Sequence, residues 1–171
     1  MKLPGTATQP ENIQIAMGKL DIRKGMTFLD IGCGSGAVSL AASRYTDRIY
    51  GIDRRQEAVE ASGSLVPCGN FICGEAVDVI PRLPDVDRCF IGGTRDIERF
   101  LPVLGDKAAP GFRLVIDVAR IGMASKVAGL VEELFTLEEV LQINIFRGYW
   151  LAGDIALKPV NPIFMIVGRG D

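Results

Sequence analysis

The sequence predicts an α/β fold: a mainly parallel seven-stranded sheet with a C-terminal antiparallel hairpin and helices on both faces. The first observation is that short apolar runs alternate regularly with segments of helical periodicity along 171 residues. The second is composition, because 48% hydrophobic residues and 20 glycines suit buried parallel strands joined by tight turns. No linker or repeat interrupts the alternation, so we expect residues 1–171 to form a single domain with a short N-terminal helical arm.

The first half of the chain supplies three expected strands, each followed by a helical segment. Pro10 near the start, with apolar Ile13, Ala16 and Leu20 at helical spacing, predicts an opening helix over Gln9–Leu20. Apolar runs bounded by turn residues then predict the strands. In chain order the expected elements are a strand over Thr27–Ile31, a helix over Gly36–Tyr45, a strand over Ile49–Asp53, a helix over Gln56–Leu65, a strand over Asn70–Cys73 and a helical stretch ending near Pro81.

The second half supplies four more expected strands. Gly92-Gly93 ends the fourth strand, and Pro110-Gly111 marks the entry to the fifth. The last two apolar runs are too close in sequence for a full crossover helix, so we expect them to pair as an antiparallel hairpin. In chain order these elements are a strand over Arg88–Ile91, a helix over Thr94–Leu104, a strand over Arg113–Val118, a helix over Gly122–Phe135, and strands over Val140–Phe146 and Ile163–Val167.

A glycine turn after the first expected strand is the most informative motif. It reads Phe-Leu-Asp-Ile-Gly-Cys-Gly-Ser-Gly, in which Asp30 precedes Gly32, Gly34 and Gly36. Alternate glycines let the backbone turn tightly and let a ligand approach main-chain N–H groups. Strand, turn and helix together describe the first half of a Rossmann-like unit. Asp53, at the end of the next strand, is placed to accept hydrogen bonds from a ribose diol.

Asp30 distinguishes between two cofactors that such a turn binds. Gly32, Gly34 and Ala37 also match the loose dinucleotide fingerprint, so the glycines alone leave the choice open. A carboxylate near the pyrophosphate of a dinucleotide would repel it by about 1–4 kcal/mol at about 4 Å. The ammonium and sulfonium groups of S-adenosylmethionine are cations that Asp30 would attract, so we expect S-adenosylmethionine as the cofactor. The alternative is a solvent-exposed turn carboxylate with no ligand role.

Charge and residue usage disfavour several function classes. The net charge of −2 argues against a general nucleic-acid binder. Histidine is absent and the four cysteines form no C-x-x-C pair, so we expect reduced thiols and no metal site. The sequence shows no signal peptide and no membrane-length apolar run, so we expect a soluble cytoplasmic protein with no membrane partner.

Nearly the whole chain resembles one enzyme family. The turn from Asp30 to Gly36 is typical of class I S-adenosylmethionine methyltransferases, and within that class the chain resembles the CbiT-type precorrin methyltransferases of cobalamin biosynthesis. The stretches that carry the likeness are Thr8–Asn12, Leu29–Ser35, Gly74–Ala76, Ile91–Gly93, Asn144–Gly148 and Asn161–Pro162. This chain departs from the family at Thr94–Asp96, where relatives often have smaller residues. It also departs at Asp117–Arg120, where they tend to carry neutral Thr or Asn.

The resemblance implies methylation of carbon 15 of a cobalt-precorrin and decarboxylation of the acetate side chain on carbon 12. It also implies a homo-oligomer, with a tetramer as the expected form. We expect methionine over the glycine turn, ribose on Asp53, adenine beside Glu75 and Ala76, and closure by Thr8 and Gln9. For Glu75 and Ala76 the alternative is a helix start, and for Thr8 and Gln9 a disordered arm. The expected cofactor-binding residues are Thr8, Gln9, Asp30, Gly32, Gly34, Gly36, Asp53, Glu75 and Ala76.

A tetrapyrrole substrate carries many carboxylates on an apolar ring, so its pocket needs an apolar floor and several cations. Loops after the late strands meet at one edge of a parallel sheet and can supply them. The candidates are Arg95, Arg99, Arg120 and Arg147, with Gly92 and Gly93 beside them. Arg95 and Arg147 are preferred, although any one of these arginines can also be a solvated surface residue. Methyl transfer to an electron-rich carbon needs little acid–base help, so no catalytic residue is assigned.

Two other functions remain open on the sequence alone. An RNA or protein methyltransferase of the same fold would need a basic or aromatic platform, and this chain has one Trp, three Tyr and no basic run longer than Arg54-Arg55. A non-catalytic Rossmann module that binds a nucleotide is the second. Titration with S-adenosylmethionine, S-adenosylhomocysteine and NAD distinguishes it from an enzyme.

Overall fold

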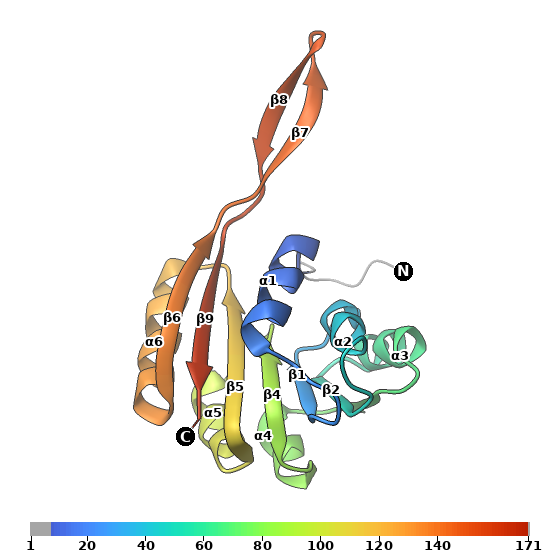
Figure 1. The fold of residues 1–171 in the computed structure, drawn as a ribbon, viewed down its shortest axis with the longest axis vertical. Coiled ribbons are helices and arrows are strands. Elements are labelled where there is room, and N and C mark those ends of the chain that lie inside the picture. The colour runs from blue at the N-terminus through green and yellow to red at the C-terminus, as the bar shows by residue number, and fades with distance from the viewer. Residues whose placement is uncertain (1–7, 171) are drawn as a thin grey trace.

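The structure, a computed structural model, describes residues 8–170. The strands of the main sheet are β1 (Phe28–Ile31), β2 (Ile49–Asp53), β3 (Asn70–Cys73), β4 (Val86–Ile91), β5 (Ala108–Val118), β6 (Thr136–Ile143) and β9 (Ile163–Arg169). The helices are α1 (Pro10–Leu20), α2 (Ala37–Ala42), α3 (Gln56–Leu65), α4 (Ala76–Val79), the 3-10 turn η1 (Ile80–Arg82), α5 (Ile97–Gly105) and α6 (Ile121–Leu134). The main sheet has seven strands in the order β3-β2-β1-β4-β5-β9-β6 (Figure 1).

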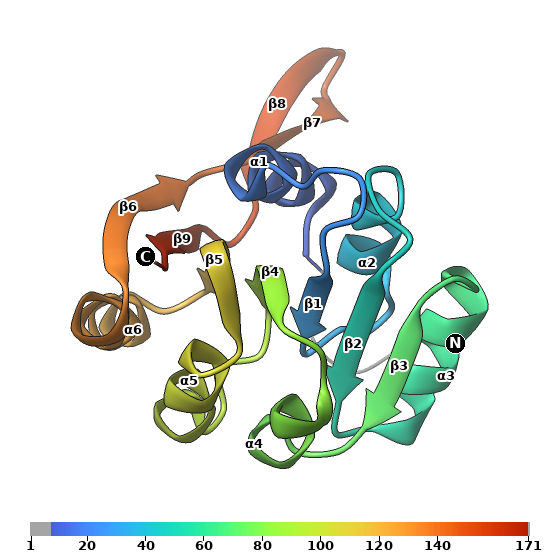
Figure 2. The same cartoon turned by 60° about the horizontal axis from the view of Figure 1, so that its bottom comes forward.

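Strands β1 to β5 run parallel, whereas β9 lies antiparallel between β5 and β6. Helices α1 and α2 pack on one face of the sheet, and α4, α5 and α6 pack on the other (Figure 2). The predicted fold, a mainly parallel seven-stranded sheet with C-terminal antiparallel pairing and helices on both faces, is confirmed. Because the first five strands share one direction, the loops that follow them gather at one edge of the sheet.

Successive side chains of each strand enter opposite halves of the core. Phe28 and Phe90 pack toward α1 and α2, while Leu29 and Ile91 pack toward α4, α5 and α6. Asp30 shares the face of Phe28, so this acidic side chain points into a core rather than into solvent. Within residues 8–170, no helix combines the length and the apolar character needed to cross a membrane.

The C-terminal part differs from the sequence prediction. The run expected as one strand over Val140–Phe146 is divided, because β6 ends at Ile143 and Phe146 begins a new strand. This strand, β7 (Phe146–Leu151), pairs antiparallel with β8 (Asp154–Pro159) in a separate two-stranded sheet. The β7–β8 hairpin projects away from the main sheet (Figure 1). Its residues are almost all exposed, so the sequence carried no burial pattern to reveal it.

Candidate functional site

A cavity of about 890 Å³ opens at the carboxyl edge of the sheet. The loops after β1, β2, β3 and β4 border it, together with Thr8 just before α1. Most of the residues expected to bind cofactor or substrate line it: Thr8, Asp30, Gly32, Gly34, Asp53, Glu75, Ala76, Gly92, Gly93, Arg95 and Arg99. Four expected residues in the described part of the chain lie outside this lining: Gln9, Gly36, Arg120 and Arg147.

Asp30 is a buried acidic group of the cavity. Its Oδ2 accepts a hydrogen bond of 2.6 Å from the hydroxyl of Ser39 on α2, and its Oδ1 has no hydrogen-bond partner among the described residues. Complete burial raises the pKa of Asp30 to about 7, although the Ser39 hydrogen bond opposes this change. A buried carboxylate oxygen without a partner is stabilised by a cationic donor. The site therefore fits the ammonium group of S-adenosylmethionine.

The glycine turn brings main-chain atoms to the cavity. Gly32 has a φ of 79°, and a Cβ at this position would lie 2.8 Å from the backbone nitrogen of Gly93. The turns after β1 and β4 are thus in direct backbone contact. Gly34 has a φ of 55°, and the nearest atom to a Cβ there would be 3.8 Å away, so this position is open. Gly36 precedes α2 and packs against Ser62 of α3.

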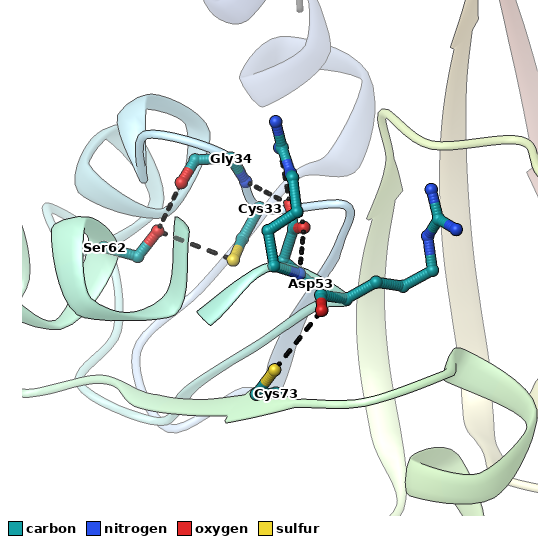
Figure 3. Close-up of polar contacts among 7 residues, drawn as sticks. Cys33, Gly34, Asp53, Ser62 and Cys73 are labelled. Carbon is teal, nitrogen blue, oxygen red and sulfur yellow. Dashed lines mark hydrogen bonds and ion pairs between the residues drawn. The ribbon is translucent and has the colours of Figure 1, made fainter. Parts of the chain in front are cut away.

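Asp53 ends β2 and holds the glycine turn. Its Oδ2 accepts hydrogen bonds from the Gly34 N–H at 3.0 Å (Figure 3) and from Arg55 Nη2 at 3.1 Å. Its Oδ1 accepts from the Arg55 backbone N–H at 3.1 Å and from Arg55 Nε at 3.0 Å. Burial raises the pKa of Asp53, but the hydrogen bonds from Arg55 and Gly34 outweigh burial and leave the pKa below its ordinary value. Asp53 is therefore ionised at neutral pH.

The loop after β3 forms another wall of the cavity. Glu75 is exposed and is the N-cap residue of α4, and Ala76 is the first residue of that helix. The Gly74 N–H donates to the Asp53 carbonyl oxygen at 3.0 Å, which ties this loop to the end of β2. The placement agrees with a helix start, and adenine recognition by Glu75 and Ala76 stays a prediction.

Arg95 and Arg99 reach the cavity from the loop after β4 and from α5. Both are exposed and both line the cavity. Asp96 lies between them with a φ of 57°, so α5 begins at Ile97 and not at Thr94 as expected. Arg95 Nε lies 3.8 Å from Asp96 Oδ2 at the exposed rim. An exposed pair of this kind is weak, on the order of 0–1 kcal/mol, so Asp96 restrains the Arg95 side chain only slightly.

Arg147 and Arg120 occupy other positions. Arg147, near the start of β7, donates to both carboxylate oxygens of Glu11 on α1 and, at 3.2 Å, to the side chain of Gln9. The hydrogen bond from Arg147 lowers the pKa of Glu11. Arg120 is the exposed N-cap residue of α6. Arg147 thus connects the β7–β8 hairpin to the first helix.

Three side chains of the cavity region were missed at the sequence level. Ser39 donates a hydrogen bond to Asp30, and Arg55 donates hydrogen bonds to Asp53. Phe90 of β4 lies opposite Asp30 of β1 and lines the cavity. No local motif marks Ser39 or Phe90, because only the packing of α2 and the pairing of β4 bring them to Asp30. Arg55 carried a weak signal, since it stands two residues after Asp53.

Asp117 is a second buried acidic residue, near the end of β5. Neither carboxylate oxygen has a hydrogen-bond partner within residues 8–170, and burial raises the pKa of Asp117 to about 7. Because β4 and β5 are parallel with Ile91 opposite Ile116, Asp117 lies beside the turn that begins at Gly92. It is not among the residues that line the cavity. Its signal in the sequence was a charged residue within the apolar run Leu114–Val118.

Comparison with known proteins identifies the family. The family model described as the precorrin methyltransferase domain matches residues 4–168. A protein of Methanosarcina mazei named probable cobalt-precorrin-6B C(15)-methyltransferase (decarboxylating) is 31% identical, with 99% of this chain and 96% of the relative covered. A protein of the same name from Archaeoglobus fulgidus is 32% identical, with coverage of 98% and 99%. The solved structure of precorrin 8W decarboxylase from Methanobacterium thermoautotrophicum has a TM-score of 0.90 at 25% identity, with 97% of this chain and 92% of that chain covered. The chain belongs to the precorrin methyltransferase family.

Proposed function

We propose that this protein uses S-adenosylmethionine to methylate carbon 15 of a cobalt-precorrin and removes the carboxyl group of the acetate on carbon 12, as a step of cobalamin biosynthesis. The observation that carries the proposal is one cavity that joins Asp30 and Asp53 to Arg95 and Arg99, in a chain whose full-length relatives are named for this reaction.

In this proposal the cavity divides into a cofactor half and a substrate half. Asp30 would hold the ammonium group, the turn at Gly34 the methionine, Asp53 the ribose, and Glu75 with Ala76 the adenine. S-adenosylmethionine supplies an electrophilic methyl group when bound. The protein's own contribution is to orient the two reactants and to exclude water, which are large effects in reactions between bound partners. Thr8, at the cavity, is the proposed closing residue, with Gln9 beside it.

Arg95 and Arg99 would bind substrate carboxylates, with Gly92 and Gly93 allowing the ring to approach the cofactor. During decarboxylation the macrocycle accepts the electron pair of the breaking carbon–carbon bond. The protein therefore needs only to hold the ring and to desolvate one carboxylate. Arg147 and Arg120 are the remaining proposed contacts, and Arg147 would have to exchange its bond to Glu11 for one to the substrate.

Replacing Arg95 or Arg99 by Ala is expected to lower kcat/KM for the tetrapyrrole by about 10- to 100-fold, because each change removes a charge-assisted hydrogen bond of about 1.5–3 kcal/mol. The assay follows transfer of a labelled methyl group and release of carbon dioxide from a cobalt-precorrin together. S-adenosylhomocysteine affinity, measured by calorimetry, should not change. Arg44→Ala, an exposed arginine outside the cavity, is the control for loss of one charge. If a folded, cofactor-binding wild-type enzyme forms neither product, the corrinoid substrate is wrong.

We further propose a homo-oligomer, a tetramer, assembled through the β7–β8 hairpin. Residues that face each other across an antiparallel pair share one face of the ribbon. Trp150 pairs with Ile155 and Gly148 with Leu157, which places Trp150, Ile155 and Leu157 on the same face with exposed fractions of 76%, 62% and 65%. Phe146 lies on this face too, at 57%. A contiguous apolar face on a projecting hairpin is typical of a protein interface.

Trp150→Asp combined with Leu157→Asp is expected to reduce the mass of the assembly in solution to that of one chain. Buried carboxylates would oppose contact between apolar faces, and light scattering after size-exclusion chromatography measures the mass. Tyr149→Asp, on the opposite face of the ribbon, is the matched control and should leave the assembly intact. A wild-type protein that is monomeric at all concentrations would contradict the proposed oligomer.

We also propose that the enzyme acts in the cytoplasm on a tetrapyrrole and not on nucleic acid. Its four cysteines all lie in the described range and are unpaired, as is usual in a reducing compartment.

A further inference from the structure

The Asp53 carboxylate already accepts as many hydrogen bonds as it can hold. A carboxylate has two oxygens with about four lone-pair positions in total. Each Asp53 oxygen accepts two hydrogen bonds in the structure, three of the four from Arg55 and one from the Gly34 N–H. A ribose diol bound at this carboxylate needs two acceptor positions. Two of the present bonds come from the Arg55 guanidinium, through Nε and Nη2, and these are the bonds that a side chain can release.

The stability of α3 does not explain why an arginine is found at position 55. It is the N-cap residue of α3 and makes no side-chain capping hydrogen bond. Helix N-caps favour Ser, Thr, Asp and Asn, whose oxygens accept bonds from the first N–H groups of the helix. A guanidinium has no acceptor, and its positive charge lies at the positive end of the helix dipole. The hydrogen bonds to Asp53 offset this unfavourable placement.

We propose that the Arg55 side chain occupies the ribose-binding position of Asp53 in the cofactor-free protein and leaves it when the cofactor binds. This inference rests on the proposed cofactor and deepens it. The Arg55 side chain is 37% exposed and the Asp53 side chain 7%, so the guanidinium can rotate into solvent. The backbone N–H groups of Arg55 and Gly34 keep Asp53 in position during this exchange. Arg55 therefore lowers the affinity for ligands that carry a ribose diol.

The experiment compares S-adenosylhomocysteine with its 2′,3′-dideoxy analogue by calorimetry at neutral pH. The proteins are the wild type, Arg55→Ala, Arg55→Lys and the charge control Arg44→Ala. Arg55→Ala is expected to bind S-adenosylhomocysteine about three- to tenfold more tightly, the equivalent of one partly exposed ion pair. Its affinity for the dideoxy analogue should stay as in the wild type, because that ligand does not compete for Asp53. The affinity of Arg55→Lys for S-adenosylhomocysteine should lie between those of the wild type and Arg55→Ala, since lysine lacks the two-point contact.

Weaker binding of S-adenosylhomocysteine by Arg55→Ala would overturn the proposal, because it would make Arg55 a direct cofactor contact. An equal change for both ligands would overturn it too, since the effect would then not depend on the ribose hydroxyls. Thermal unfolding of each variant without ligand verifies that the protein is folded at the temperature of the titration. Failure of the wild type to bind either ligand would reject the cofactor itself, an outcome distinct from the two above.

Discussion

Asp30→Asn is expected to weaken S-adenosylhomocysteine binding by about 2–3 kcal/mol while it raises the free energy of unfolding of the ligand-free protein near pH 8 by about 1–3 kcal/mol. The two effects have opposite signs for one reason. Asp30 is fully buried with one oxygen lacking a partner among the described residues, so its charge is costly without a ligand and useful with a cationic one.

The pH dependence gives a second signature of Asp30. Its pKa is raised to about 7 in the folded protein, so the stability that the neutral form contributes is present below the unfolded pKa of about 3.9 and is lost as pH rises through about 7. The gain in stability from Asp30→Asn should therefore be large near pH 8 and small near pH 5. Wild-type affinity for the cofactor should fall as pH drops below about 7, because a proton then competes with the ammonium group for Asp30.

Asp117→Asn is the matched control for Asp30→Asn. Asp117 is also buried without a partner within residues 8–170 and its pKa is also raised to about 7, but it does not line the cavity. Chemical denaturation of both variants should show a similar gain in stability near pH 8, and calorimetry should show a loss of affinity for Asp30→Asn alone. Equal affinity in the two variants would show that Asp30 does not contact the cofactor.

Gly32→Ala is expected to lower the free energy of unfolding by about 2–4 kcal/mol. The residue has a φ of 79°, which disfavours a side chain, and its Cβ would lie 2.8 Å from the backbone nitrogen of Gly93. No side-chain rotation can relieve this clash, because the backbone fixes the position of a Cβ and the atoms that it would meet in Gly92 and Gly93 are main chain. Urea denaturation of the ligand-free protein measures the change.

Comparing Gly34→Ala with Gly32→Ala separates the energetic cost of the backbone conformation from the cost of the steric clash. Its φ of 55° is also positive, but the nearest atom to the new Cβ would be 3.8 Å away, so the expected loss of stability is only about 1 kcal/mol. The folded Gly34→Ala variant should nevertheless fail to bind S-adenosylhomocysteine, since the methyl group would stand between the ligand and the turn. Similar destabilisation by both changes would argue that the contact with Gly93 is unimportant.

Much of the fold could be predicted because its signals are local. Strands such as Ile49–Asp53 are apolar runs between turn residues, and the turn from Asp30 to Gly36 fixes where the first strand meets the cavity. The cavity lining follows from topology, since parallel strands bring their carboxyl ends together. The contacts of individual side chains were harder to predict. Arg147 was expected at the substrate, and its bond to Glu11 joins residues 136 positions apart, a pairing that no local pattern encodes.

The β7–β8 hairpin has a consequence for how stability is distributed along the chain. Its two strands bond to each other and form no ladder with the seven-stranded sheet, and a lone two-stranded ribbon is marginally stable in water. In a monomer the amide protons of the hairpin would therefore exchange with solvent through local opening, long before the main sheet unfolds. Contact between apolar faces in an assembly would close this route. If the proposed assembly forms, amide exchange in residues 146–159 should slow as protein concentration rises, whereas exchange in β1 and β4 should follow global unfolding.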